Sequence, residues 1–286
     1  MSEGVAELIE TRLAATEPRS WRLGTQTLMT GGVAGLAVLA LFAQRWGLPT
    51  AVSVAVPWLL VLGLLGTSWL VGKRQRALRR DILAASDHGQ LEQWGAAVDI
   101  LNRVMRRPIR PRSLRGEAFL LWATLAERDR HFEDAARLYE ALLLRRIGDA
   151  TQLQRANIAL AGAKLRIGEL ADAVDLIGRL ERVPMPRPLR ALCDLIRLYQ
   201  QVSMGHMEDA VSNMEERRAA FRRDLSTQAG YAYALLAAAR HHLGQADEAG
   251  RLWRDATLLI KPERLVWDFD LLRSVSAAYA AAEHPV

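Results

Sequence analysis

The chain has 286 residues, of which 50% are hydrophobic and 24% are charged, and its formal net charge is +6. This composition can form buried cores, so it excludes an intrinsically disordered protein. The apolar residues concentrate in two charge-free stretches, 23–43 and 48–72, which exclude a wholly soluble protein. The single cysteine, Cys193, cannot form an internal disulfide.

The two charge-free stretches predict a transmembrane helical hairpin over residues 23–72. At about 1.5 Å per residue, each stretch can cross a hydrocarbon layer of about 30 Å as a helix. Only residues 44–47 separate the stretches, which favours a hairpin over a cleaved signal peptide. Neither stretch contains an ionisable side chain, so we expect the hairpin to anchor the protein rather than to transport ions.

The charges around the hairpin predict its orientation. Eight Lys and Arg residues flank the outer ends of the hairpin, and only Arg45 lies in its turn. By the positive-inside rule, both termini then lie in the cytoplasm, including an amphipathic N-terminal segment, 1–22. Lysine is rare among the 38 basic residues, a bias typical of GC-rich bacterial genomes, so we expect a protein of the bacterial inner membrane.

Gly31 and Gly35 form a G-x-x-x-G pair in the first predicted span. Small residues at this spacing let another helix approach closely. The favoured interpretation is transmembrane packing against the second span of the same hairpin. The alternative is a homo-oligomer formed through the hairpin.

Residues 73–262 contain a repeated pattern, in which a short turn is followed by acidic or polar residues and an alanine. The repeated alanines are Ala97, Ala135, Ala173, Ala210 and Ala249, at intervals of 38, 38, 37 and 39 residues. Such a regular period predicts stacked pairs of amphipathic helices. Large residues four positions on are expected to fill the space between neighbouring pairs; they are Leu101, Tyr139, Ile177, Met214 and Trp253. Residues 263–286 are expected to form a capping helix, 263–282, and a tail.

The best copies of this pattern resemble the tetratricopeptide repeat family. The second copy has Phe119, Trp122, Ala123 and Ala126 before Ala135 and Tyr139, and the last copy has Tyr233, Leu236 and Ala237 before Ala249 and Trp253. These residues are similar to the family's W-x-x-L-G-x-x-Y and A-x-x-x-F pattern. The resemblance implies an all-α fold, in which an α-solenoid of about five helix pairs follows the hairpin. The layout of a short hairpin followed by such repeats is similar to that of the HemY family.

The resemblance also implies a groove lined by the first helix of each pair, which holds a segment of a partner protein. By position, the candidate groove residues are Glu117, Thr124, Arg128, Arg155, Arg166, Tyr199, Tyr231 and His242. Arginine and tyrosine on this face suit a helix or an acidic and apolar segment. The alternative is that the chain's own N-terminal or C-terminal helix fills the groove.

Two groups of basic residues are candidates for contact with anionic lipid. They are Lys73, Arg74, Arg76, Arg79 and Arg80 after the hairpin, and Arg106, Arg107 and Arg110 within a run of six arginines between residues 103 and 115. Near a bilayer, each such residue is worth roughly 1 kcal/mol of attraction to anionic headgroups. A solvated face is the equal alternative. A nucleic-acid partner is not expected, because the run lacks interleaved aromatic residues.

No pattern in the sequence points to catalysis or to a cofactor. The chain has no nucleophile elbow, phosphate-binding Gly-rich loop or zinc-ligand spacing. We therefore expect a non-enzyme without metal or cofactor, a membrane-anchored scaffold that recruits partner proteins at the inner membrane. The alternative is an accessory subunit of a transport, secretion or envelope-biogenesis complex, in which the hairpin makes the essential contacts.

Overall fold

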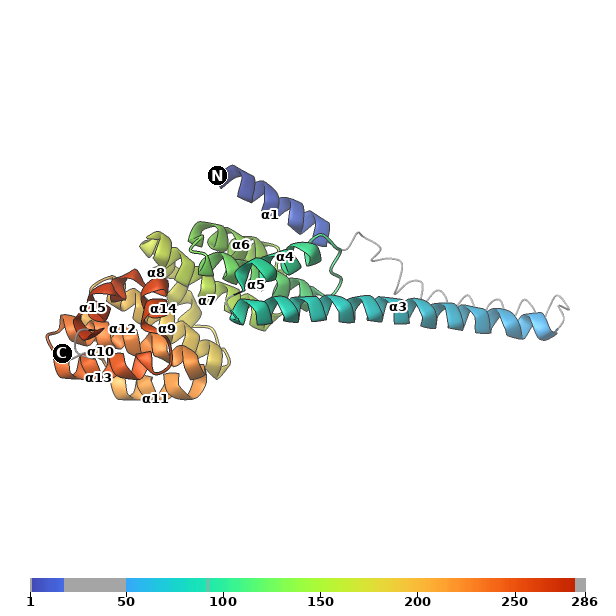
Figure 1. Ribbon diagram of the computed structural model, residues 1–286. Coiled ribbons are helices and arrows are strands. Elements are labelled where there is room, and N and C mark those ends of the chain that lie inside the picture. Colours follow the sequence, from blue (N-terminus) through green and yellow to red (C-terminus); the bar gives the residue numbers. More distant parts are fainter. Residues whose placement is uncertain (1, 18–49, 92, 281–286) are drawn as a thin grey trace. The chain divides into compact units, whose positions relative to one another are not determined.

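Helices are the main secondary structure of the described part of the chain. The computed structural model describes residues 2–17, 50–91 and 93–280, and in these ranges it contains helices and no strands (Figure 1). The predicted all-α class is therefore confirmed. The first predicted span, 23–43, lies outside the described residues, together with Gly31 and Gly35.

Two compact units make up the chain. The first consists of residues 1–125 with 147–149, and the second consists of residues 126–146 with 150–286. The division falls inside the region 73–262, which the sequence predicts as one repeat domain.

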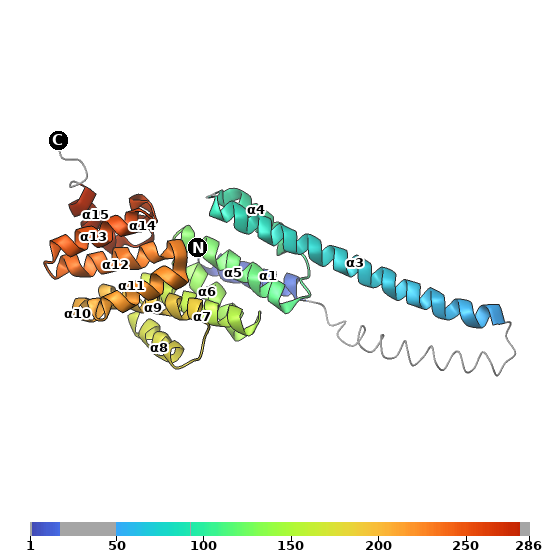
Figure 2. The ribbon, with the colours of Figure 1, turned by 90° about the horizontal axis from the view of Figure 1, so that it is seen from below.

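The first unit contains α1 (Ser2–Thr16), α3 (Thr50–Gln90), α4 (Trp94–Val104) and most of α5 (Arg112–Arg128). α3 has 41 residues, which corresponds to a length of about 60 Å. α4 folds back along the C-terminal part of α3 (Figure 2). Ile82 and Ala85 of α3 and Ala97 and Leu101 of α4 are at most 1% exposed. This pair of helices therefore has its own apolar contact.

α3 begins within the second predicted span, 48–72, and continues into the first helix of the repeat region. Over the part of the chain that the structure describes, no helix combines the length and the apolar character that crossing a bilayer requires. The expected span at 48–72 is therefore not identified among the described helices.

The N-terminal helix α1 is tied to the rest of the first unit. Leu13 and Thr16 are fully buried. Arg115 donates from Nη2 to the carbonyl of Leu13 at 2.8 Å and from Nε to Thr16 Oγ1 at 3.1 Å, and the N–H of Ile109 donates to the carbonyl of Thr16 at 3.2 Å. A guanidinium at this position satisfies the last carbonyls of α1 and complements the negative end of the helix dipole. Most of the expected segment 1–22 is thus a packed helix.

The second unit begins with the last turn of α5 and continues through the remaining helices. They are α6 (Phe132–Leu144), α7 (Ala150–Ile167), α8 (Leu170–Glu181), α9 (Arg187–Ser203), α10 (Met207–Val211), α11 (Met214–Leu225), η2 (Ser226–Gln228), α12 (Ala229–His242), α13 (Ala246–Thr257), α14 (Pro262–Asp268), η3 (Asp270–Leu272) and α15 (Arg273–Ala280). α7 contacts α6, α8 and α9, and α9 in turn contacts α12, which packs closely on α13. The helix pairs therefore stack in chain order.

One turn geometry joins the two helices of successive pairs. The residue before the second helix's N-cap has a positive φ, of 62° at Arg130, 93° at Gly168, 80° at Gly205 and 74° at Gly244. The N-cap residue then donates its N–H to a carbonyl five residues earlier at 2.8–2.9 Å, and this bond also occurs at Gln93 in the first unit. This is the Schellman motif, which satisfies carbonyls at the end of the first helix. The repeated turn of the sequence is thus a repeated turn of the backbone.

The repeated alanine occupies the same place in each pair. Ala97, Ala135, Ala173, Ala210 and Ala249 are each the fourth residue of the second helix and are each 0% exposed. The alanines that mark the period are therefore buried at equivalent positions. A methyl group at this site lets the two helices approach closely, and a larger side chain would overpack the crossing.

The fourth pair departs from the expected pattern. α10 ends at Val211, Ser212 is extended, and Asn213 adopts the left-handed region with φ 50° and ψ 35° before α11 begins. Met214 is therefore the first residue of a new helix and remains partly exposed. The prediction that Met214 fills the space between pairs is wrong, whereas its four counterparts are at most 3% exposed.

The expected capping helix, 263–282, is also broken. α14 ends at Asp268, Phe269 is extended with φ −138° and ψ 96°, and η3 and α15 follow. Leu265, Phe269, Leu272 and Val275 are at most 4% exposed. The prediction of one continuous helix is therefore wrong, although its apolar residues do cover the end of the second unit.

Candidate functional site

The break at Phe269 brings residues 267–270, here called the Trp-Asp-Phe-Asp segment, against the first helices of four successive pairs. These first helices are the last turn of α5, with α7, α9 and α12. Four of the candidate groove residues predicted from the sequence meet this segment; they are Arg128, Arg166, Tyr199 and Tyr231. All of these residues belong to the second unit.

Phe269 is the apolar centre of the site. Its ring lies 4.7 Å from the ring of Tyr199 and 5.6 Å from that of Tyr231, both edge to face. The guanidinium of Arg166 lies 5.0 Å from the Phe269 ring, 5.9 Å from Tyr199 and 5.2 Å from Phe132. Edge-to-face rings and a cation over a ring face are each favourable. Phe269 therefore occupies a cage of two tyrosines and one arginine.

Asp268 anchors the segment to α12. Tyr231 donates its hydroxyl to Asp268 Oδ2, and Arg264 donates to the same oxygen from Nε at 2.9 Å. Burial, followed by the negative charge of Asp268, raises the pKa of Tyr231 to about 12. Tyr231 therefore keeps its proton, and its role as a donor, across the physiological pH range.

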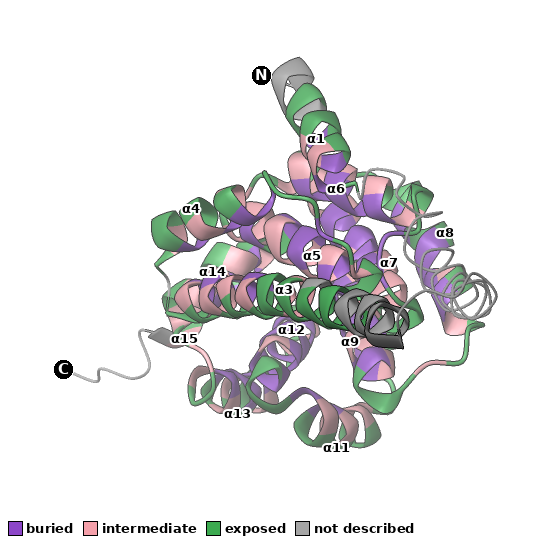
Figure 3. Cartoon of the chain, turned by 90° about the vertical axis from the view of Figure 1, so that its right-hand side faces the viewer, coloured by how far each residue is buried: buried purple, intermediate pink, exposed green. Residues whose placement is uncertain are grey.

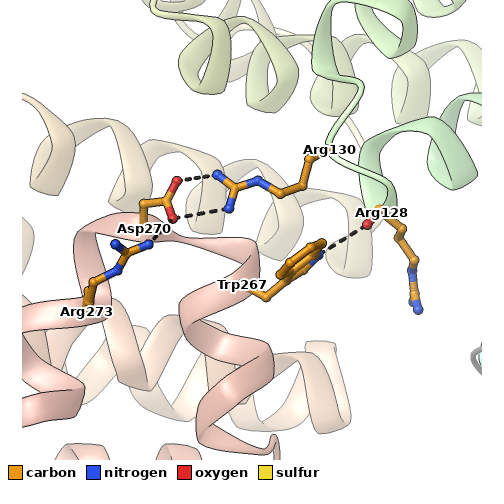
Figure 4. Close-up of polar contacts among 5 residues, drawn as sticks. All are labelled: Arg128, Arg130, Trp267, Asp270 and Arg273. Carbon is orange, nitrogen blue, oxygen red and sulfur yellow. Dashed lines mark hydrogen bonds and ion pairs between the residues drawn. The ribbon is translucent and has the colours of Figure 1, made fainter.

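Trp267 and Asp270 bind the end of α5 and the turn after it (Figure 4). Trp267 donates from Nε1 to the carbonyl of Arg128 at 3.2 Å. Arg130 donates from Nη1 to Asp270 Oδ1 at 3.2 Å and from Nη2 to Oδ2, and its guanidinium lies 5.5 Å from the Trp267 ring. The hydrogen bond from Arg130 holds the pKa of Asp270 below its usual value. Arg130 is thus shared between an aromatic ring and a carboxylate.

Glu127, which precedes Arg128 in α5, is an imperfectly paired carboxylate. Glu127 Oε2 is 3.8 Å from Arg166 Nη1, and the Glu127 side chain is 18% exposed. Burial raises the pKa of Glu127 to about 6, although Arg166 and a hydrogen bond from Tyr139 oppose the rise. Among the described residues, neither Glu127 Oε1 nor Arg166 Nε has a hydrogen-bond partner. The site is therefore less completely satisfied than an ordinary protein core.

The other candidate groove residues lie elsewhere. Glu117 and Thr124 belong to the first unit, where Thr124 is exposed and donates to the carbonyl of Leu120. Arg155 and His242 belong to the second unit and are both exposed. None of the contacts described above involves these four residues. The arrangement of the second unit matches the alternative in which the chain's own C-terminal part occupies the groove.

Sequence reasoning missed Arg130 and the Trp-Asp-Phe-Asp segment. Arg130 stands where three of the other turns have glycine, and this departure from the pattern was the available signal. The alternation of aromatic and acidic residues at 267–270 was a second signal.

The basic residues proposed to contact lipid are exposed without exception. These are Lys73, Arg74, Arg76, Arg79, Arg80, Arg106, Arg107 and Arg110. Exposed residues run along much of α3 (Figure 3). A hollow along α3 is lined by Trp69, Lys73, Arg76, Arg79, Arg80 and Leu83, and the Lys73 ammonium lies 5.3 Å from the ring of Trp69.

The exposed face of α3 changes character along its length. Leu62, Leu65, Trp69 and Leu70 are between 53% and 61% exposed, and the cations begin at Lys73, one turn after Trp69. Aromatic residues followed by cations are typical of the boundary between the apolar and headgroup layers of a bilayer. The first unit therefore carries exposed apolar residues followed by exposed cations along one helix.

Comparisons with known proteins found no matching family model, no matching curated protein and no matching solved structure. Across the described ranges, no group of three or more His, Cys, Asp or Glu side chains is placed to hold a metal ion.

Proposed function

We propose that this protein is a membrane-anchored helical-repeat scaffold of the tetratricopeptide kind, which recruits partner proteins at the cytoplasmic face of a bacterial inner membrane. In this proposal the second unit binds the partner and the N-terminal hairpin anchors the chain. The observation that carries the proposal is the turn geometry that recurs from Gln93 to Gln245, because stacked helix pairs of one kind create extended binding surfaces.

The chemistry of the first-helix face supports a protein partner. Arg130, Arg166, Tyr199 and Tyr231 lie on or beside four successive first helices and together bind an aromatic and acidic segment. Arginine and tyrosine are enriched among residues that dominate protein interfaces. These residues hold the segment through hydrogen bonds, ring contacts and an ion pair, and such contacts fit a binding role.

The membrane part of the proposal rests on different observations. Residues 23–43 form a charge-free stretch, which lies outside the described part of the chain. The exposed apolar residues of α3 precede a row of exposed cations. The flanking positive charges favour the cytoplasmic side for both termini.

The experiment that tests the anchor compares the full chain with a variant that lacks residues 23–72. The full chain should stay in the membrane pellet after an alkaline wash, and the deletion variant should move to the supernatant. Equal distribution of the two proteins would contradict the anchor. A reporter that is active only in the cytoplasm should be active when it is fused after residue 286. A reporter that is active only outside the cytoplasm should be inactive at the same position.

Partner binding is tested by placing a photo-crosslinking residue on the second unit. Arg155 on the first helix α7 and Arg179 on the second helix α8 are both exposed. Replacement of Arg155 should give a discrete adduct in living cells, and replacement of Arg179 should not. Equal labelling from both positions would argue against the first-helix face as the binding surface.

A second candidate function is that of an accessory subunit in a membrane complex. It is favoured by the Trp-Asp-Phe-Asp segment, which already occupies the first-helix face, while the apolar residues of α3 remain exposed. Exchange of residues 23–72 for an unrelated two-span anchor separates the two functions. The scaffold should keep its cellular activity after this exchange, and the accessory subunit should lose it.

A further inference from the structure

We infer that the first-helix face of the second unit recognises a partner segment of alternating aromatic and acidic residues, and that the chain's own Trp-Asp-Phe-Asp segment occupies this site as a displaceable internal ligand. This inference rests on the proposed function, because it names the chemistry of the partner that the scaffold binds. When no partner is bound, the Trp-Asp-Phe-Asp segment keeps the site closed.

The contacts of the segment have the form of ligand recognition. Each of its four residues meets a different feature: Trp267 binds a backbone carbonyl of α5, Asp268 binds a tyrosine hydroxyl, Phe269 enters the aromatic cage, and Asp270 pairs with a guanidinium. Phe269 is the one extended residue between α14 and η3. An aromatic anchor in a pocket, beside acidic groups that arginine binds, is a known mode of peptide recognition.

The receiving side is assembled from elements distant from the segment in sequence. Arg166 lies on α7, Tyr199 on α9 and Tyr231 on α12, and Arg166 also contacts the ring of Phe132 on α6. The cage is therefore held by helices that pack on one another. It does not depend on residues 267–270 alone for its position.

Arg130 is the residue whose conformation is explained by this contact. Its φ of 62° lies in the left-handed region, where the corresponding turns have Gly168, Gly205 and Gly244. Non-glycine residues held there are unfavourable and are found where the surrounding structure or a function requires them. The guanidinium of Arg130 reaches both Trp267 and Asp270, and a lone glycine could make neither contact.

The outer edge of the contact is open to solvent. Trp267 is 48% exposed, and the side chains of Arg130 and Asp270 are 35% and 52% exposed. Only Phe269 is fully inserted, at 4% exposed. An incoming acidic and aromatic segment can thus engage Arg130 before Phe269 leaves the cage, and the partner competes with an internal ligand at high effective concentration.

The test uses the purified full chain and a fluorescent peptide with the sequence of residues 262–273. The internal ligand should keep the wild type closed, so the peptide should bind weakly. Phe269→Ala and, separately, Asp270→Lys weaken the internal ligand, and each should raise peptide affinity at least tenfold. Glu263→Ala removes an exposed acid in the first turn of α14, outside the Trp-Asp-Phe-Asp segment, and should leave the affinity unchanged. Adding Arg130→Glu to Phe269→Ala should reverse the gain, and a peptide carrying D268N and D270N should bind at least tenfold more weakly.

Hydrogen exchange on the same proteins separates displacement from unfolding. The amides of residues 264–272 should exchange faster than those of α12 in the wild type, and added peptide should protect α9 and α12 in the Phe269→Ala variant. The inference is overturned if 264–272 and α12 exchange together, if no variant binds the peptide better than the wild type, or if binding requires loss of protection in α12. Peptide binding only by a dimeric wild type would identify a second copy as the occupant and would also overturn it.

Failure of this experiment differs from failure of the proposed function. If the peptide does not bind but Arg155 still gives its discrete adduct and the full chain stays in the membrane pellet, the scaffold stands and only the ligand chemistry is wrong.

Discussion

Arg130 and Asp270 form a two-point ion pair although they are 140 residues apart in sequence. The pair links the turn after α5 to the first residue of η3, and it holds the Trp-Asp-Phe-Asp segment against the first-helix face of the second unit (Figure 4). The guanidinium of Arg130 also lies over Trp267. Asp270 is shared with Arg273, which donates from Nη2 to Oδ1 at 3.2 Å.

The stability of the turn should depend on what replaces Arg130. Arg130→Ala loses an exposed ion pair worth about 0.2–1 kcal/mol and keeps the left-handed backbone. Arg130→Gly loses the same pair but relieves the backbone, so it should be more stable than Arg130→Ala by about 0.5–1 kcal/mol in unfolding free energy. Urea unfolding followed by circular dichroism measures the difference. If Arg130→Ala is the more stable variant, the backbone of residue 130 at φ 62° is not strained.

Two helical glycines should respond oppositely to alanine. A Cβ at Gly178 in α8 would meet no atom within 4 Å, whereas a Cβ at Gly230 in α12 would lie 2.9 Å from Ile260 Cγ1 and 3.1 Å from Leu259 Cβ. Gly178→Ala should therefore stabilise the protein by about 0.5–1 kcal/mol, because alanine is the better helix former. Gly230→Ala should destabilise it, since overpacking typically costs about 1–3 kcal/mol. Thermal melting of both variants measures the direction of each stability change. A change in the same direction for both variants would contradict the close packing around Gly230.

The contribution of Glu127 to the unfolding free energy should decrease as pH rises from 5 to 7. Its folded-state pKa of about 6 lies above the ordinary value of 4.5, so the folded protein binds this proton more tightly than the unfolded chain. This contribution to stability is fully present below the unfolded pKa and is lost as pH rises through the folded pKa. Relative to Glu127→Gln, the wild type should gain about 1 kcal/mol of unfolding free energy between pH 7 and pH 5.

Urea unfolding at several pH values tests the Glu127 prediction. The comparison with Glu127→Gln cancels the contribution of every group other than Glu127 to the pH dependence of stability. If the unfolding free energies of the two proteins depend on pH in the same way, folding does not shift the pKa of the Glu127 carboxyl.

The repeat register made part of the site predictable. The spacing of Ala135, Ala173 and Ala249 fixes the phase of the helix pairs. With that phase, the resemblance to the tetratricopeptide family implies that Arg166, Tyr199 and Tyr231 lie on one face. The buried alanines follow from the same argument, because the period is a local property of the sequence. All five are fully buried.

Contacts between distant parts of the chain were not predictable in this way. Residues 268–270 contain neither proline nor glycine, so nothing local signals a helix end; the contacts of Phe269 with Tyr199 and Tyr231 accompany the break. Arg115 belongs to a run of arginines typical of a solvated face, yet it binds the end of α1 across 102 residues. Such tertiary contacts override local preference.

The cations of α3 should strengthen the binding of anionic lipid by the full chain. Arg76 and Arg80 are exposed and line the hollow beside Trp69. Each cation close to a membrane surface contributes about 1 kcal/mol, so replacing both by glutamine should weaken retention of phosphatidylglycerol by up to about 30-fold at low salt. The effect should shrink near physiological salt, where charges are screened beyond about 8 Å. The measurement is titration of phosphatidylglycerol into the full chain held in neutral detergent, with phosphatidylcholine as the uncharged comparison.

The matched control for this lipid prediction replaces Arg251 and Arg254, which are exposed on α13 of the second unit. This variant has the same change in net charge as the α3 variant, so a purely global effect of charge would weaken lipid retention equally in both. A local site on α3 predicts loss in the α3 variant alone, and loss for phosphatidylglycerol but not for phosphatidylcholine. Equal loss in the two variants would mean that the row of cations on α3 is a solvated face.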